Sequence, residues 1–368
     1  MAITAAMVKE LREMTGAGVM ACKNALVETD GDFDGAIEIL RKKGEATAVK
    51  KAGRIAAEGT VLAVVEGNKA AIVEVNSETD FVAKNDKFKS FVANVADQIL
   101  ASDAADVEAL CEEKFIKDES KTVKEELVSQ IAVIGENLTI RRFAKINTEG
   151  VVVPYIHAGG RIGVLVESAT ANANDEVKEA LKNIAMQIAA LNPKYTSRND
   201  ISADELAKLR EITVESALND PFTLPKPILN KLLDKAVNDK VWSDEDIAIF
   251  EEKKSNMNYL PNFLSNEAKA SLAELALADK EAIAGDKIFS GLVEGRVSKQ
   301  LKEICLLDQA YVKAADGKQT VAQYVAEVAK NTGVDFSVKG FVRYETGEGL
   351  EKKSEDFAAE VAKQMAGN

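Results

Sequence analysis

The sequence of 368 residues contains little of what most catalytic sites are built from. His157 is its only histidine, and Cys22, Cys111 and Cys305 are its only cysteines. A single histidine excludes the usual histidine-containing zinc cluster and leaves few routes to a Ser-His-Asp triad. The cysteines show no paired spacing, which favours reduced core thiols over metal ligands or disulfides. We therefore predict a protein that acts by binding, is not an enzyme and needs no cofactor.

Nucleotide-binding loops and an excess of basic residues are also lacking. No Gly-x-x-x-x-Gly-Lys-Ser/Thr or Gly-x-Gly-x-x-Gly run occurs, which argues against nucleotide binding by those loops. Lys and Arg number 47 against 60 Asp and Glu, a net charge of -13. This acidic balance argues against a general nucleic-acid or membrane-surface binder. No signal peptide or apolar run of membrane length is present, so a cytoplasmic location is predicted.

The most informative stretch runs from Thr79 through Asp86. An alternating, strand-like run precedes it (71–75), and apolar residues at helical spacing follow from Phe88. The stretch is therefore predicted to join a strand to an amphipathic helix. On spacing alone, Phe81 can be the first core residue of a helix capped by Thr79, or an exposed residue directed at a partner.

An internal repeat helps to separate these two interpretations. A shift of 89 residues, the offset between Val75 and Val164, aligns a strand, loop and helix with a second strand, loop and helix. In the second copy, Thr79-Asp80-Phe81-Val82 is replaced by Ser168-Ala169-Thr170-Ala171. If this architecture required an apolar residue at the turn, the second copy would show one. The comparison favours Asp80 and Phe81 as exposed, functional residues.

The first 44 residues are predicted to form three short helices, the third ending at Gly44. Such a small bundle is marginally stable alone, which suggests a docking role. From Arg41 to Arg54 the chain holds six basic residues and one acid, Glu45, without an aromatic. A solvated helix or linker is predicted there, because single-stranded nucleic-acid sites also use stacking residues.

The remaining patterns predict a mixed fold of strands and helices, in at least two domains because of the chain's length. Hairpins are expected at 60–75 and 151–166, further strands at 138–146, 309–313 and 341–344, and helices at 175–191 and from Thr320. Four of the six prolines and Trp242 lie between residues 205 and 285, which we interpret as an inserted helical subdomain. A final helix is expected within 346–368.

Five motifs in order resemble the elongation factor Ts family, and together they cover nearly all of the chain outside about 205–285. They are Val8-Lys9-Glu10-Leu11-Arg12 with Thr15-Gly16-Ala17-Gly18, Thr79-Asp80-Phe81-Val82-Ala83-Lys84, Ile134-Gly135-Glu136-Asn137 with Arg141-Arg142, Arg161-Ile162-Gly163-Val164-Leu165-Val166, and Gly340-Phe341-Val342-Arg343-Tyr344 with Gly347-Glu348-Gly349.

The resemblance implies an α+β fold. Its expected parts are a ubiquitin-associated-like (UBA-like) three-helix bundle with the basic linker (1–54), two similar core subdomains (55–140 and 141–345) and a C-terminal helical module (346–368). The second subdomain would carry the helical insertion at about 205–285. Some family members self-associate through a helical hairpin in that region. The segment here does not read as a simple hairpin, so the sequence leaves homodimer formation open.

The resemblance also implies a function, guanine nucleotide exchange on elongation factor Tu, bound in its GDP-loaded and nucleotide-free states. It places Thr79, Asp80, Phe81 and Val82 against the nucleotide-binding domain of that partner, where they displace Mg²⁺, and His157 near another of its domains. It implies no nucleic-acid or membrane partner. Two alternatives come from other classes: a helical adaptor that uses only the bundle, and a hydrolase based on carboxylates, for which no acid pair is evident.

Overall fold

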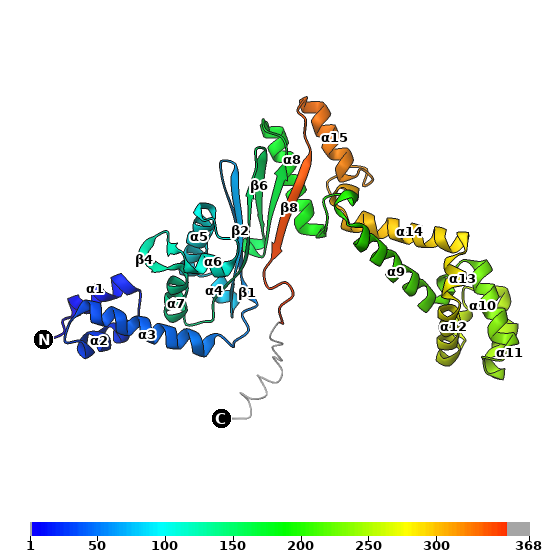
Figure 1. Ribbon diagram of the computed structural model, residues 1–368, viewed down its shortest axis with the longest axis horizontal. Coiled ribbons are helices and arrows are strands. Elements are labelled where there is room, and N and C mark those ends of the chain that lie inside the picture. Colours follow the sequence, from blue (N-terminus) through cyan, green and yellow to red (C-terminus); the bar gives the residue numbers. More distant parts are fainter. Residues whose placement is uncertain (1, 352–368) are drawn as a thin grey trace. The chain divides into compact units, whose positions relative to one another are not determined.

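The computed structural model describes residues 2–351, which form two compact units. The first unit comprises residues 1–192 and 322–368, and the second comprises 193–321. Within the described range both helices and strands occur, which confirms the predicted α+β class (Figure 1). The predicted C-terminal helical module lies outside the described residues, apart from its first few positions.

Three helices open the first unit: α1 (Ala5–Thr15), α2 (Val19–Glu28) and α3 (Phe33–Lys51). Leu11, Cys22 and Leu26 form the centre of their small core, all fully buried. The prediction that the third helix ends at Gly44 is wrong. The helix continues because Gly44 lies against α7 (Val123–Ile134), where an added Cβ would be 3.6 Å from side-chain atoms of Val128 and Ala132. The basic stretch is thus mostly helix, and Arg41 pairs with acids on both α3 and α7.

Two three-stranded antiparallel sheets follow, with the orders β1-β2-β5 and β6-β7-β8. Their strands are β1 (Glu58–Glu66), β2 (Lys69–Ser77), β5 (Thr139–Asn147), β6 (Val151–His157), β7 (Ile162–Ser168) and β8 (Val338–Glu345). Each sheet is a hairpin whose second strand also pairs with a strand that arrives later in the chain. Both predicted hairpins and the predicted repeat are therefore confirmed as structure.

The two sheets pack face to face, and a helix covers the outer face of each (Figure 1). Alternation along β2 explains this arrangement, because successive side chains in a strand point to opposite faces. Ala70 and Ile72 lie in the core between the sheets, whereas Ala71, Val73 and Val75 pack under α5 (Asp86–Ala101). On the second sheet α8 (Asp175–Leu191) takes the place of α5, with the bounds that the sequence predicted.

Shorter elements complete the first unit. Before β5 the chain forms α4 (Asp80–Ala83), α6 (Val107–Glu112), the small hairpin β3 (Lys114–Phe115) and β4 (Asp118–Thr122), and α7; before β8 it forms α15 (Val321–Thr332). Glu125 completes a capping box with Thr122 at the start of α7. The strand predicted at 309–313 is shortened to an isolated antiparallel bridge between Ala310 and Thr320, flanked by backbone hydrogen bonds from Tyr311 to Gln319 and from Val321 to Gln309.

The second unit is helical and contains the segment predicted as an insertion. Its helices are α9 (Ala203–Asn219), α10 (Lys226–Asn238), α11 (Asp244–Lys253), α12 (Asn266–Ala278), α13 (Lys280–Ala284) and α14 (Lys287–Ile304). Trp242 is buried in its core, donates to the Ala268 carbonyl at 2.9 Å and packs edge-on against Phe250. The unit thus has a hydrophobic core of its own.

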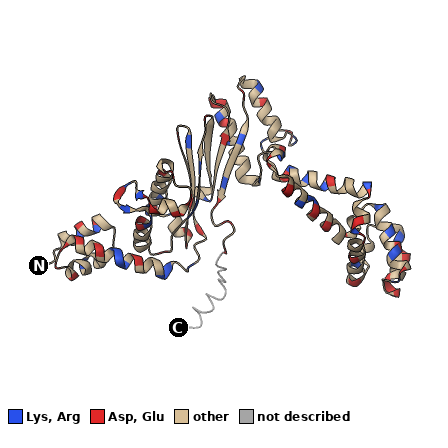
Figure 2. Cartoon of the chain, in the orientation of Figure 1, with Lys and Arg blue, Asp and Glu red and all other residues tan. Residues whose placement is uncertain are grey.

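Acidic and basic side chains are interspersed along the helices of both units (Figure 2). Among the described residues, no helix combines the length and the apolar character that crossing a membrane requires.

Candidate functional site

The chain turns outward where β2 ends, in the four residues Thr79–Val82, which we call the exposed turn. Thr79 has extended backbone angles, and its hydroxyl accepts a hydrogen bond from the Val82 N–H at 3.4 Å. This is an N-cap, which satisfies a donor that a helix start leaves unpaired. A single helical turn, α4, results at the predicted strand-to-helix corner.

The side chains of the exposed turn point in different directions. Phe81 is 81% exposed, the largest fraction among the described large hydrophobic side chains. Its neighbour Val82 is partly buried and packs against the core under α5. Because consecutive residues of a helix point about 100° apart, Val82 anchors the turn while Phe81 projects from it. The predicted exposure of Phe81 is confirmed.

Asp80 is also on the surface and carries a negative charge. Its carboxylate forms an ion pair with Lys84 Nζ at 2.7 Å. The hydrogen bond from Lys84 holds the pKa of Asp80 below its usual value, so the group is ionised at neutral pH. An anionic group and an exposed aromatic ring are therefore adjacent on one short turn.

A carboxylate from a distant loop holds the exposed turn from behind. Glu136 accepts hydrogen bonds from the backbone N–H groups of Glu78 at 3.1 Å and Thr79 at 3.0 Å, and from the Thr79 hydroxyl at 2.7 Å. The next residue, Asn137, donates its backbone N–H to Glu78 Oε1 at 2.7 Å. In the sequence Glu136 is part of a motif, but nothing in that motif predicts this role.

The second copy of the repeat uses the equivalent turn differently. Ser168 and Thr170 are buried, with Thr170 only 5% exposed. The Ser168 hydroxyl donates to the Ser337 carbonyl at 2.5 Å and the Thr170 hydroxyl donates to the Asp335 carbonyl at 2.8 Å. Both contacts tie the turn to the segment that precedes β8. The exposed residues of this turn are Ala169 and Ala171, so it offers no large projecting side chain like that of Phe81.

His157 lies apart from the exposed turn in the contacts that the described residues make. It ends β6, is exposed, and its Nδ1 is 3.0 Å from the Tyr155 hydroxyl. No hydrogen bond or ring contact in the described part of the chain joins it to residues 79–82. The structure thus brings together the four residues of the exposed turn and leaves His157 on the other sheet.

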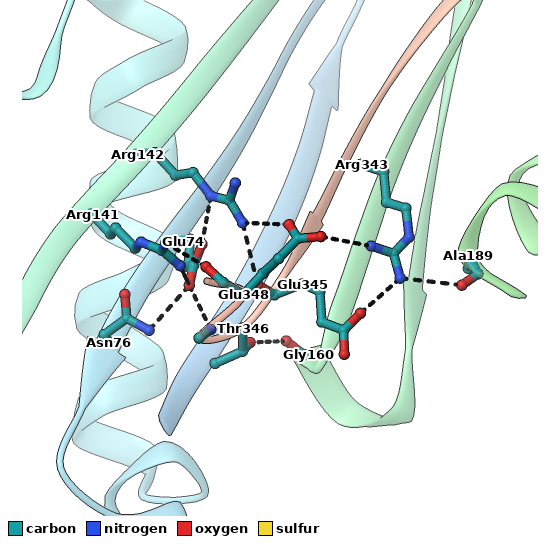
Figure 3. A network of polar contacts seen from close by, with 11 residues as sticks. Glu74, Asn76, Arg141, Arg142, Gly160, Ala189, Arg343, Glu345, Thr346 and Glu348 are labelled. Carbon is teal, nitrogen blue, oxygen red and sulfur yellow. Dashed lines mark hydrogen bonds and ion pairs between the residues drawn. The ribbon is translucent and has the colours of Figure 1, made fainter. Parts of the chain in front are cut away.

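A buried polar network fixes the sheet that carries the exposed turn (Figure 3). Glu74 on β2 is fully buried, and its carboxylate contacts Arg141 at 2.9 Å, Arg142 at 2.6 Å and the Gly347 N–H at 2.8 Å. Burial acts to raise the pKa of Glu74, but these hydrogen bonds and one from Asn76 together hold it below its usual value. The network links β2 and β5 to the chain just beyond β8.

The other chemically reactive groups form no site in the described part of the chain. Cys22 and Cys305 are buried, Cys111 is partly buried, and all three are free thiols. Burial raises the pKa of the Cys111 thiol, which disfavours the reactive thiolate. No cluster of three or more His, Cys, Asp or Glu side chains within residues 2–351 could hold a metal ion.

Comparison with known proteins gives a consistent result. A family model described as "Elongation factor TS" matches residues 78–251 and 260–348. The chain is 43% identical over 366 residues to the elongation factor Ts of Clostridium novyi (strain NT), with 99% of each chain covered. It is 42% identical, with the same coverage of both chains, to the elongation factor Ts proteins of Clostridium tetani (strain Massachusetts / E88) and Clostridioides difficile (strain 630).

Proposed function

Because this chain belongs to the elongation factor Ts family, and is thus a nucleotide exchange factor of translation elongation, we propose that the exposed turn is the element that releases GDP from elongation factor Tu. The chain would bind the GDP-loaded partner, displace its Mg²⁺ and loosen the contacts that hold the phosphates. GDP then leaves a nucleotide-free complex, and binding of GTP to the partner separates the two proteins. No bond is made or broken in this cycle, so the protein acts by binding energy.

The observation that carries the proposal is the exposure of Phe81 on a rigidly held corner. An exposed phenylalanine costs solubility, and its 81% exposure leaves nearly the whole ring available to a partner. The cap at Thr79, the anchor at Val82 and the brace at Glu136 fix its direction. Aromatic side chains that enter a partner's pocket commonly supply a large share of binding energy.

The chemistry of bound GDP explains how such a turn can act. Backbone N–H groups of a phosphate loop and a metal ion that bridges phosphate oxygens hold the nucleotide. A ring inserted between helices of the partner would move the elements that position those groups. The neighbouring Asp80 carboxylate would compete for water or backbone contacts around the ion. Both effects weaken GDP binding without any reaction at GDP.

The coupling must be reciprocal. Every ~1.4 kcal/mol by which this protein weakens nucleotide binding is tenfold in affinity, and nucleotide weakens the binding of this protein by the same factor. Incoming GTP can therefore release the protein from its partner, which allows repeated exchange. We also propose that His157, which is exposed at the end of β6 beside the Tyr155 hydroxyl, contacts another domain of elongation factor Tu.

The test is the substitution Phe81→Ala. We expect the fold to persist, because the ring is exposed, and the stimulated release of GDP from elongation factor Tu to fall at least tenfold. The measurement is the dissociation rate of a fluorescent GDP analogue in stopped flow. Phe263→Ala is the matched control, because Phe263 is also exposed (51%) but belongs to the other compact unit. A wild-type rate for Phe81→Ala would refute the role of the turn.

A further inference from the structure

We propose that Glu136 is the positioning residue of the exposed turn: its carboxylate holds Phe81 in the direction needed for exchange, without touching the partner's nucleotide. This inference rests on the proposed function. Glu136 lies 57 residues after Thr79 in the chain, yet accepts three hydrogen bonds from Glu78 and Thr79, at 2.7 to 3.1 Å. Hydrogen bonds to a charged acceptor are about twice as strong as neutral ones.

The exposed turn needs such a support because it is too short to hold itself. α4 contains four residues, and a single helical turn is unfavourable without outside contacts. The backbone N–H groups of Glu78 and Thr79, just before α4, donate to Glu136. The Thr79 hydroxyl, which caps α4, donates to Glu136 Oε1. Loss of this carboxylate would remove all three hydrogen bonds together, and the turn would keep only the Ser77 hydroxyl on the Thr79 carbonyl, at 3.0 Å, and the packing of Val82 among the contacts described for it.

The loop that carries Glu136 is fixed on its other side by the end of the N-terminal bundle. Lys51 Nζ donates to the Gly135 carbonyl, and Asn137 Nδ2 donates to the Arg54 carbonyl at 2.8 Å. Arg54 in turn lies 3.4 Å from the Glu78 carboxylate. The loop 135–137 therefore connects the exposed turn to the end of α3 and the residues that follow it. Because the turn is already held in place before binding, the binding energy of the Phe81 ring is not used to order the turn and can be used to change the partner.

The experiment compares Glu136→Ala, Glu136→Gln and a matched control, Glu205→Ala. Glu205 also accepts three hydrogen bonds, from the Ser202 N–H and hydroxyl and from the Tyr195 hydroxyl, but in the second unit. We measure the rate of fluorescent-GDP release from elongation factor Tu as a function of variant concentration. Glu136→Ala should lower the maximal rate about tenfold and change the half-saturating concentration less than about twofold, because other contacts provide binding. Glu136→Gln, which keeps an acceptor for the backbone, should recover most of the rate, and Glu205→Ala should match the wild type.

A double-mutant cycle with Phe81→Ala separates positioning from general stability. If Glu136 acts through the ring, Glu136→Ala will have almost no further effect once Phe81 is absent. An undiminished effect in that background, or a wild-type maximal rate for Glu136→Ala, overturns the inference. These outcomes are distinct from failure of the proposed function, in which Phe81→Ala itself keeps the wild-type rate. Thermal unfolding of each variant identifies loss of fold. If Glu136→Ala does not fold, Glu136→Asp supplies the test, because its shorter side chain keeps the charge but withdraws the carboxylate from Thr79: its maximal rate should fall, and a wild-type maximal rate overturns the inference.

Discussion

The two copies of the repeat have the same strand, turn and helix, but their residues differ at positions that include one in the turn and one on the central strand. At the turn, Phe81 projects into solvent, whereas its counterpart Thr170 is buried and hydrogen-bonded. On the central strand, Glu74 of the first copy corresponds to Gly163 of the second, and both face the interior between the sheets. The first copy therefore carries the projecting group and the buried charge, and the second copy allows close packing. In this duplicated fold, the second copy thus packs against the first copy, and only the first copy has the exposed ring at its turn.

The largest effect is expected from exchanging the turns. Replacing Thr79–Val82 by the second-copy residues Ser-Ala-Thr-Ala keeps a hydroxyl at the cap but removes the ring and the acid. We expect stimulated GDP release to fall about a hundredfold, equivalent to about 2.7 kcal/mol, measured by stopped flow. In the reciprocal change, Thr170→Phe should lower the thermal midpoint, because this site is 5% exposed. Equal activity of the exchanged chain would show that the copies do not differ in function.

The buried charge of the first copy gives the next largest effect. Glu74→Gln removes the buried carboxylate that pairs with Arg141 and Arg142, while Arg142 keeps its ion pair with Glu348 at 3.2 Å. These arginine side chains are 23% and 31% exposed and can recover some hydration, so we expect a loss of about 2 kcal/mol in the free energy of unfolding, below the range for fully buried pairs. Urea denaturation measures it. Glu167→Gln on β7 is the control, since its partner Lys339 is 56% exposed and little should change.

The same network predicts a pH dependence. The folded-state pKa of Glu74 is lowered from its ordinary value of 4.5, so its stabilisation is complete above pH 4.5 and is lost as the pH falls through the lower, folded-state pKa. The difference in free energy of unfolding between the wild type and Glu74→Gln should therefore be constant near neutral pH and shrink in acid. A difference that grows below pH 4.5 would contradict this assignment.

The smallest effect concerns the close packing of the second copy. A Cβ at Gly163 would lie 2.4 Å from Val61 Cγ1 and 3.3 Å from the Cδ1 atoms of Ile72 and Ile156. Gly163→Ala should cost about 1 kcal/mol, at the low end for overpacking, because the obstructing atoms are side-chain methyl groups. The control is Gly340→Ala on β8, where an added Cβ has no neighbour within 4 Å. Equal stability of the two variants would show that the two sheets can move apart to accept the added methyl group without a loss in the free energy of unfolding.

Local patterns were sufficient for much of the fold. The bounds of α8 were predicted correctly because its apolar positions repeat at helical spacing and Asn174 caps it. The exposure of Phe81 followed from comparing it with Thr170. Residues 309–313 alternate like a strand, but their pairing with 319–321 is limited to one bridge, and the length of a pairing is not contained in a local pattern. The predicted segment, about 205–285, is shorter than the compact unit 193–321, because the prediction relied on the density of prolines and α14 contributes to the unit without containing one.

The supporting residues of the site were harder to predict. Glu136 reaches the exposed turn only after the chain has formed α5 to α7, and a lone acid in a loop is usually solvated. Glu74 did leave a signal: an acid in the middle of an apolar, alternating strand, with Arg141-Arg142 in the next strand of that sheet. Predicting that Glu74 pairs with these arginines would have required knowledge of the register between β2 and β5.

The second unit begins and ends at neighbouring points. Lys194 and Tyr195 donate their N–H groups to the Ile304 carbonyl, Leu306 donates back to Tyr195, and Val321 donates to Gln309. These hydrogen bonds hold the entering and leaving segments of the unit next to each other. A short linker can therefore join the residues on either side of this unit if the unit is deleted or replaced.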